Sequence, residues 1–167
     1  MNRFMSFLQD IKGKLIVSCQ ALPDEPLHSS FIMGRMALAA KEGGAAAIRA
    51  QSSADIVEIR KVTGLPVIGL VKRNYDDSPI YITPTLKEVE ELLATECEML
   101  ALDMTGRERP GKEKAEALVA RIHEAGRLVL ADISTYEEGM TAADMGADAI
   151  LMAAGAYAPI IKRVHCQ

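Results

Sequence analysis

The sequence of 167 residues has no tryptophan, and aromatic residues make up only 4% of it. Ala, Val, Ile, Leu and nine Met residues must therefore fill the core. The three cysteines, Cys19, Cys97 and Cys166, are odd in number, and their spacing fits neither a metal site nor a disulfide framework. The three histidines share no metal-binding spacing either. We expect a reduced, cytoplasmic chain without a metal.

Long apolar runs and basic patches are also missing. No stretch approaches the roughly 20 apolar residues that span a bilayer, and the first residues lack the apolar core of a signal peptide. The net charge is −4, whereas a nucleic-acid-binding protein usually presents a basic face. We therefore expect neither a membrane nor a nucleic acid as partner. No glycine-rich G-x-G-x-x-G loop and no Walker-type loop follows an expected strand, which argues against a nucleotide-binding doubly wound sheet.

The chain does contain a repeated alternation of short apolar runs and helical patterns. The clearest run is 65–73, which has a proline, Pro66, near its start and ends on the cations Lys72 and Arg73. Its apolar part is rich in Val and Ile, as is typical of a buried parallel strand. About six strand–helix units follow one another, which indicates a parallel sheet. The expected strands are 15–20, 45–48, 65–71, 97–102, 128–131 and 149–152, with a short extra strand at 80–82. We expect the first of them, 15–20, to be buried. The expected helices are 4–11, 31–42, 53–62, one from about 85, 113–124 and 135–145.

Helix-capping signals support several of these boundaries. Ser52 or Ser53 can cap the third helix, and Thr85 with Glu88 has the spacing of a capping box. Residues 135 and 138 repeat the same spacing before the last helix.

Polar or charged residues stand at the ends of the first five expected strands: Gln20, Arg49, Lys72, Asp103 and Asp132. Parallel strands end at one rim, and a (β/α)8 barrel builds its active site there. The alternative is that strand ends are simply more polar than strand centres. We predict an α/β fold of the (β/α)8 TIM-barrel type with about six units in one domain, 1–167; a doubly wound sheet would also fit the alternation.

Lys72 is the candidate general base. A lysine beside an apolar strand can lose hydration, which lowers its pKa toward a useful value. The plain alternative is a lysine whose charged end reaches the solvent.

These strand ends resemble those of a known family. The segments that carry the resemblance are Ser18-Cys19-Gln20-Ala21-Leu22-Pro23, Ile48-Arg49-Ala50, Pro66-Val67-Ile68-Gly69 with Lys72-Arg73, Tyr81-Ile82-Thr83-Pro84-Thr85, Ala101-Leu102-Asp103 and Ala131-Asp132-Ile133-Ser134-Thr135. In this order and register, from about 11 to 148, they look like the N-acetylmannosamine-6-phosphate 2-epimerases. The resemblance implies a (β/α)8 barrel that interconverts N-acetylmannosamine 6-phosphate and N-acetylglucosamine 6-phosphate in sialic-acid breakdown, without a redox cofactor.

The resemblance also implies residue roles. Lys72 corresponds to the catalytic lysine that moves the proton at C2, while Gln20, Arg49 and Asp132 correspond to residues that hold the sugar and position that lysine. Asp103, at the matching end of the fourth strand, is expected to bind substrate. Chemically, Arg49 can stabilise the negative oxygen of an enolate, and Asp132 can hold the ammonium group or a sugar hydroxyl.

Two positions depart from the family pattern. Gln51 stands where the family usually has Asn, an amide with the same hydrogen-bonding groups. After the sixth strand, residues 153–167 no longer resemble the family, which continues through two more units that supply a catalytic glutamate and phosphate-binding loops. We therefore expect an incomplete barrel with an atypical tail, a homo-oligomer (a dimer) that covers the open sheet edges, and weak or absent turnover.

Three functions remain open. The first is a sugar-phosphate epimerase. The second is a catalytically silent sugar-phosphate-binding or assembly protein derived from that family. The third is another phosphate-binding barrel enzyme, such as an isomerase of sugar or amino-acid biosynthesis.

Overall fold

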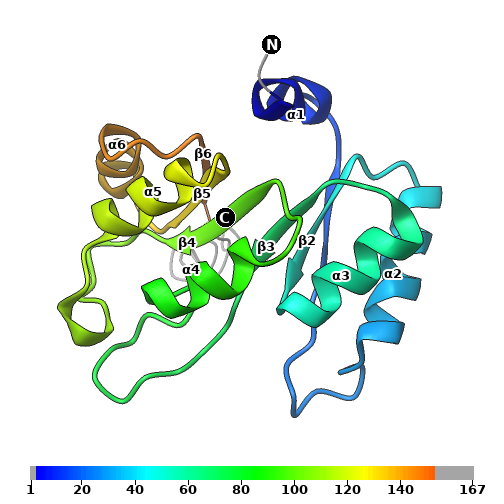
Figure 1. The fold of residues 1–167 in the computed structure, drawn as a ribbon, viewed down its shortest axis with the longest axis horizontal. Coiled ribbons are helices and arrows are strands. Elements are labelled where there is room, and N and C mark those ends of the chain that lie inside the picture. The colour runs from blue at the N-terminus through cyan, green and yellow to red at the C-terminus, as the bar shows by residue number, and fades with distance from the viewer. Residues whose placement is uncertain (1–2, 153–167) are drawn as a thin grey trace, which may run out of the picture.

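The computed structural model describes residues 3–152, and within them six parallel strands form one sheet in chain order (Figure 1). The strands are β1 (Ile16–Cys19), β2 (Ala47–Gln51), β3 (Val67–Leu70), β4 (Met99–Asp103), β5 (Leu128–Ile133) and β6 (Ala149–Met152). The helices are α1 (Arg3–Ile11), α2 (Ser30–Glu42), α3 (Ser53–Thr63), α4 (Leu86–Leu93), α5 (Ala115–Glu124) and α6 (Tyr136–Asp144), with a short 3-10 helix η1 (Pro110–Lys112).

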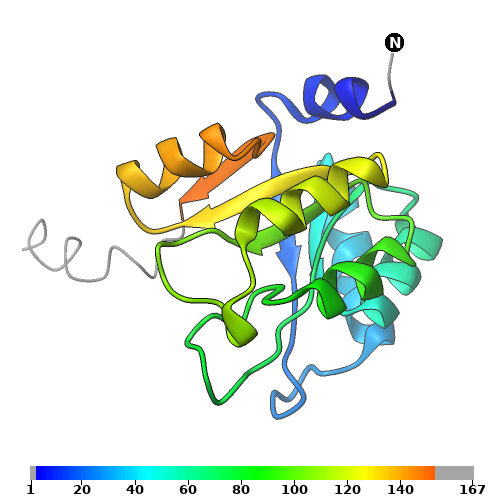
Figure 2. The same cartoon turned by 60° about the vertical axis from the view of Figure 1, so that its left-hand side comes forward.

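The strand order decides between the two predicted architectures. Every strand pairs with its neighbours in the chain, from β1 to β6. Right-handed crossovers between consecutive parallel strands place all their helices on the same side of the sheet, whereas a doubly wound sheet reverses its order and has helices on both sides. Helices α2 to α6 accordingly surround a curled sheet (Figures 1 and 2). The predicted TIM-barrel type is confirmed, here as a partial barrel of six units.

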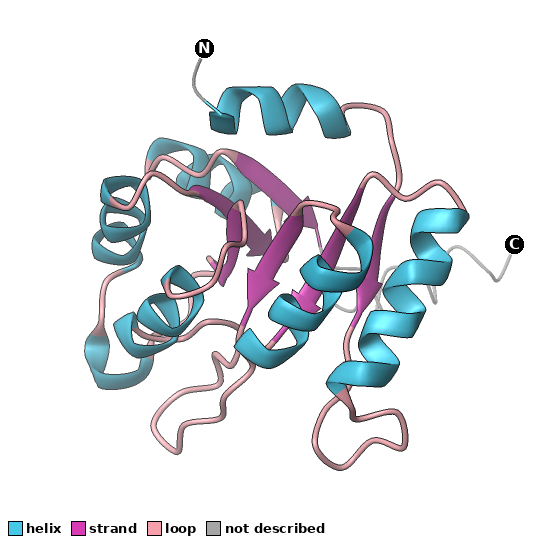
Figure 3. Cartoon of the chain, turned by 45° about the vertical axis from the view of Figure 1, so that its right-hand side comes forward, coloured by secondary structure: helices cyan, strands magenta, loops and turns pink. Residues whose placement is uncertain are grey.

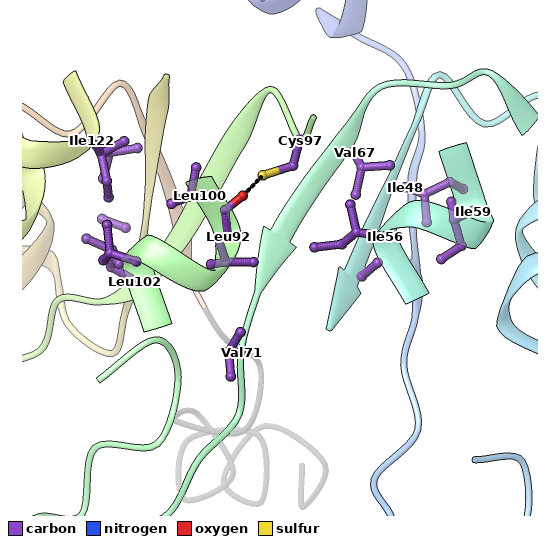
Figure 4. Close-up of a cluster of buried hydrophobic side chains, with 14 of the residues drawn as sticks. Ile48, Ile56, Ile59, Val67, Val71, Leu92, Cys97, Leu100, Leu102 and Ile122 are labelled. Atoms are coloured by element: carbon purple, nitrogen blue, oxygen red, sulfur yellow. Dashed lines mark hydrogen bonds between the residues drawn. The ribbon is translucent and has the colours of Figure 1, made fainter. Parts of the chain in front are cut away.

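The main core lies between the outer face of the sheet and these helices. Ile48 and Val67 from the strands pack against Ile56, Ile59 and other helical residues, all of them fully buried (Figure 4). Short β-branched and aliphatic side chains fill this layer, as the shortage of aromatic residues requires.

A second apolar cluster fills the concave face of the sheet at the end where the strands begin. It contains Phe7 of α1 together with strand residues that alternate with those of the main core: Ala47, Ile68, Leu70, Met99, Ala101, Leu128 and Leu130. Helix α1 lies across this end (Figure 3). The same alternation, continued toward the opposite end, places the polar strand-end residues on the concave face.

The capping predictions are confirmed, with Ser52 as the N-cap of α3 and capping boxes at 85–88 and 135–138. Other boundaries need correction. Arg49 lies inside β2, not after it. No strand forms at 80–82; only an isolated antiparallel bridge joins Ile82 to Lys72. The last expected segment, 153–167, lies outside the described residues.

The first strand was predicted to be buried, and this is wrong. Leu15 and Ile16 are 58% and 36% exposed. Among residues 3–152, β1 pairs only with β2, so it forms one edge of the sheet, and its apolar residues have fewer neighbours than those of β3.

Candidate active site

Arg49 and Asp132 meet across the concave face. Arg49 Nη2 donates a hydrogen bond of 2.5 Å to Asp132 Oδ2, and both side chains are largely buried. Two strands, β3 and β4, separate β2 from β5 in the sheet. Only the curl of the sheet lets side chains three strands apart touch. The contact therefore spans the mouth of the partial barrel.

Asp132 carries the most unusual carboxyl group of this region. Burial raises its pKa from 3.8 to about 6, and the charge of Asp103 acts in the same direction, while Arg49 and Lys72 oppose the rise. The ion pair with Arg49 thus compensates only part of the lost hydration. Asp132 changes its charge near pH 6, close to neutrality.

Lys72 follows β3 by two residues and is half-buried. Burial lowers the pKa of its ammonium group, and the nearby Arg49 cation lowers it further, while Glu25 and Asp132 act in the opposite direction. Lys72 also lines a pocket of about 260 Å³ with residues of the loops after β1 and β3: Leu22, Pro23, Asp24, Asn74 and Tyr81. A partly dehydrated amine at an open pocket is suited to accept a proton.

Three buried polar atoms lack a hydrogen-bond partner within the described part of the chain: Gln20 Oε1, Arg49 Nε and Asp132 Oδ1. Buried polar groups are nearly always paired. All three atoms belong to residues predicted from the sequence as substrate-binding, and they offer two acceptors and one donor. Such a set is suited to the hydroxyl and carbonyl groups of a sugar derivative.

Asp103 reaches the same rim but differs in its surroundings. It is the register partner of Asp132, yet its carboxylate already accepts hydrogen bonds from the Thr105 backbone and hydroxyl, at 3.0 and 2.7 Å, and from Arg107 at 2.6 Å. Asp103 affects the site through its charge, which helps to raise the pKa of Asp132. Its substrate-binding role stays a prediction.

Two residues near the site were not predicted. Glu25, in the loop after β1, acts electrostatically on Lys72, and no sequence signal distinguishes it from other loop acids. Gln51 was noted only as a departure from the family pattern; it is buried, and its side chain donates to the Ala21 carbonyl at 3.1 Å, next to Gln20. The amide therefore holds the loop that follows the first strand.

The chain is similar to known proteins of one family. A family model described as "Putative N-acetylmannosamine-6-phosphate epimerase" matches residues 33–161. A "Putative N-acetylmannosamine-6-phosphate 2-epimerase" of Clostridium perfringens strain 13 is 64% identical over 156 residues, which cover 93% of this chain and 71% of the relative. The chain belongs to this family. Members are named 2-epimerases, and epimerases are isomerases.

Two further relatives agree. The protein of the same name from Clostridioides difficile strain 630 is 61% identical over 158 residues, which cover 95% of this chain and 71% of the relative. The solved structure of the N-acetylmannosamine-6-phosphate 2-epimerase from C. perfringens matches with a TM-score of 0.85 and 66% identity, over 86% of this chain and 62% of that one. This family structure confirms the fold. The chain spans about 71% of the length of the curated relatives and 62% of the solved one.

Residues 3–152 also bear on membrane insertion and metal binding. No helix in this range is long and apolar enough to cross a membrane. The same range contains no group of three or more His, Cys, Asp or Glu side chains that could hold a metal ion.

Proposed function

We propose that this chain binds N-acetylmannosamine 6-phosphate and interconverts it with N-acetylglucosamine 6-phosphate by proton transfer at C2. The observation that carries the proposal is the group of three unpartnered buried atoms on Gln20, Arg49 and Asp132, on the same concave face as Lys72. Membership of a family whose relatives are named for this activity supports it.

The chemistry follows from the acidity of the substrate. In the open-chain sugar, the C2 proton lies beside the C1 aldehyde. Lys72 Nζ, in its neutral form, would take this proton, and the C2–H electron pair would form a C1=C2 double bond while negative charge moves to the C1 oxygen. A proton from solvent then adds to the opposite face of C2 as the C1 oxygen regains its double bond to C1, which gives the epimer. The Lys72 ammonium group releases its proton to solvent, which restores the base.

The neighbours of Lys72 would each assist this step. Arg49, a cation on the concave face, would stabilise the negative oxygen. It also disfavours the protonated form of Lys72, so more of the amine is available as a base. The free oxygens of Gln20 and Asp132 would accept hydrogen bonds from sugar hydroxyl or amide groups and fix the C2 proton toward Lys72. Asp103 would tune Asp132 through its charge.

We further propose that the chain acts in the cytoplasm in sialic-acid breakdown, as a homo-oligomer. The oligomer is supported by the sheet edges. Within the described range, β1 and β6 each pair on one side only, and Ile150, Leu151 and Met152 are 43%, 37% and 45% exposed. Open apolar edges favour association with another surface.

The test is to incubate the purified chain, in excess over N-acetylmannosamine 6-phosphate, in heavy water and to follow C2 by NMR. We expect slow formation of N-acetylglucosamine 6-phosphate that carries deuterium at C2. Saturable binding without conversion would replace the epimerase by the catalytically silent sugar-phosphate-binding protein. If the chain neither binds nor converts the sugar phosphate, both the epimerase and the sugar-phosphate-binding protein are contradicted.

A further inference from the structure

The backbone on both sides of Lys72 is held by a separate segment. Tyr81–Thr83, which we call the clasp, runs antiparallel to it, and Ile82 forms an isolated bridge with Lys72. Thr83 N–H donates to the Val71 carbonyl at 2.7 Å, and Arg73 N–H donates to the Tyr81 carbonyl at 2.9 Å. The clasp thus fixes the residues immediately before and after Lys72.

This pairing also determines the face on which Lys72 lies. Residues opposite each other in an antiparallel bridge have their side chains on the same face of the ladder. Ile82 packs against the apolar cluster of the concave face. Lys72 is therefore held on the concave face too, where the charges of Arg49, Glu25 and Asp132 act on its pKa.

Thr83 is the clasp residue with an unfavourable backbone conformation. It is fully buried and has a φ of 44°, in the left-handed region that a β-branched residue rarely adopts. In this conformation its Oγ1 accepts a hydrogen bond of 3.3 Å from Val71 N–H. Such a conformation persists only when the surrounding structure holds it.

Arg109 stabilises this conformation of Thr83. It is 5% exposed, and its guanidinium donates to the carbonyls of Thr83, at 3.2 Å, and Pro84, at 2.9 Å, as well as to the carbonyl of Asp103. Within residues 3–152 it has no salt bridge. Burial lowers its pKa, although Asp103, Glu113 and Glu116 favour the charged form. A buried cation is costly unless hydrogen-bonded. Here the three bonds of Arg109 together connect Thr83 of the clasp, and Pro84 directly after it, to Asp103 at the end of β4.

We propose that Arg109 is a positioning residue for Lys72: by holding Thr83, it keeps the clasp closed and so holds Lys72 on the concave face. The inference rests on the proposed function only in giving Lys72 its importance; the geometry itself does not depend on turnover. A merely structural Arg109 would stabilise the chain without changing the surroundings of the Lys72 amine.

The experiment is trace acetylation of the full chain as a function of pH, read by mass spectrometry for each lysine. Lys61, whose side chain is 74% exposed, is the internal reference. Arg109→Met removes the donors. Its control is Arg121→Met, because Arg121 makes an exposed ion pair with Glu90 on the helical surface. The control must leave the profile of Lys72 unchanged.

In Arg109→Met we expect the Lys72 profile to move to higher pH, so that its reactivity relative to Lys61 falls by about threefold or more at pH 8. Thr83→Val, which loses the Oγ1 acceptor at similar volume, should shift the profile in the same direction, whereas Thr83→Ser should not. If Arg109→Met does not fold, the comparison of Thr83→Val with Thr83→Ser tests the proposal. An unchanged Lys72 profile in the folded variants, even with a lower melting temperature, would overturn the proposal. Because the readout needs no turnover, loss of the epimerase assignment would leave this result intact.

Discussion

The raised pKa of Asp132 leads to a quantitative prediction about stability. Its carboxyl group ionises at about 6 in the folded chain but at its ordinary value of 3.8 when hydration is restored. At about 1.4 kcal/mol for each pH unit, the interval between 3.8 and about 6 corresponds to a change of about 3 kcal/mol in the free energy of unfolding. Because the folded pKa is the higher one, the contribution to stability is fully present below pH 3.8 and is lost as pH rises through 6. Asp132→Asn cannot ionise and has no such contribution.

The assay is urea unfolding of the parent and of Asp132→Asn, followed by circular dichroism at several pH values from 3.5 to 7.5. The free energy of unfolding of the parent minus that of the variant should fall by about 3 kcal/mol between pH 3.5 and pH 7.5, whatever its absolute value. Asp144→Asn, which changes an exposed acid on α6, is the surface control. A difference for Asp132→Asn that stays constant within about 0.5 kcal/mol over this range would refute the reasoning.

Three further predictions concern packing, a buried network and association. In Gly69→Ala the new Cβ would lie 2.8 Å from Ile56 Cδ1, so we expect a loss of about 1 to 3 kcal/mol in urea unfolding; an unchanged stability would mean that the neighbours move freely. Glu88 is fully buried and accepts a hydrogen bond from Arg73; Glu88→Gln should lower stability by about 2 to 3 kcal/mol in thermal melts, and a loss below about 0.5 kcal/mol would show that the network contributes little. Light scattering should find a dimer or larger assembly because of the exposed β6, and a cooperative monomer at low concentration would contradict this.

Much of the fold was predictable because its signals are local. The capping boxes at 85–88 and 135–138 and the alternation of apolar runs with helical patterns lie within short windows of sequence. The sixth strand, 149–152, has the predicted bounds. The rim residues were found because polar side chains interrupt apolar strands at equivalent positions, and parallel strands bring those positions together.

The remaining features depend on contacts between distant parts of the chain. The bond from Arg49 to Asp132 joins residues 83 positions apart and depends on the curl of the sheet, which no short window of sequence encodes. Arg109 lies in a polar loop, yet it is buried, and its guanidinium binds three backbone carbonyls from distant parts of the chain. The exposure of β1 likewise depends on its place at an edge, not on its own apolar sequence.

We propose above that Lys72 moves the C2 proton. The most direct measurement is the rate of solvent exchange at C2 of N-acetylmannosamine 6-phosphate, with the parent, Lys72→Met and the surface control Lys61→Met each in excess over the sugar. We expect the rate to fall by at least about a hundredfold in Lys72→Met, the scale expected for loss of a general base, and to stay at the parental value in Lys61→Met. A near-parental rate in folded Lys72→Met would contradict it.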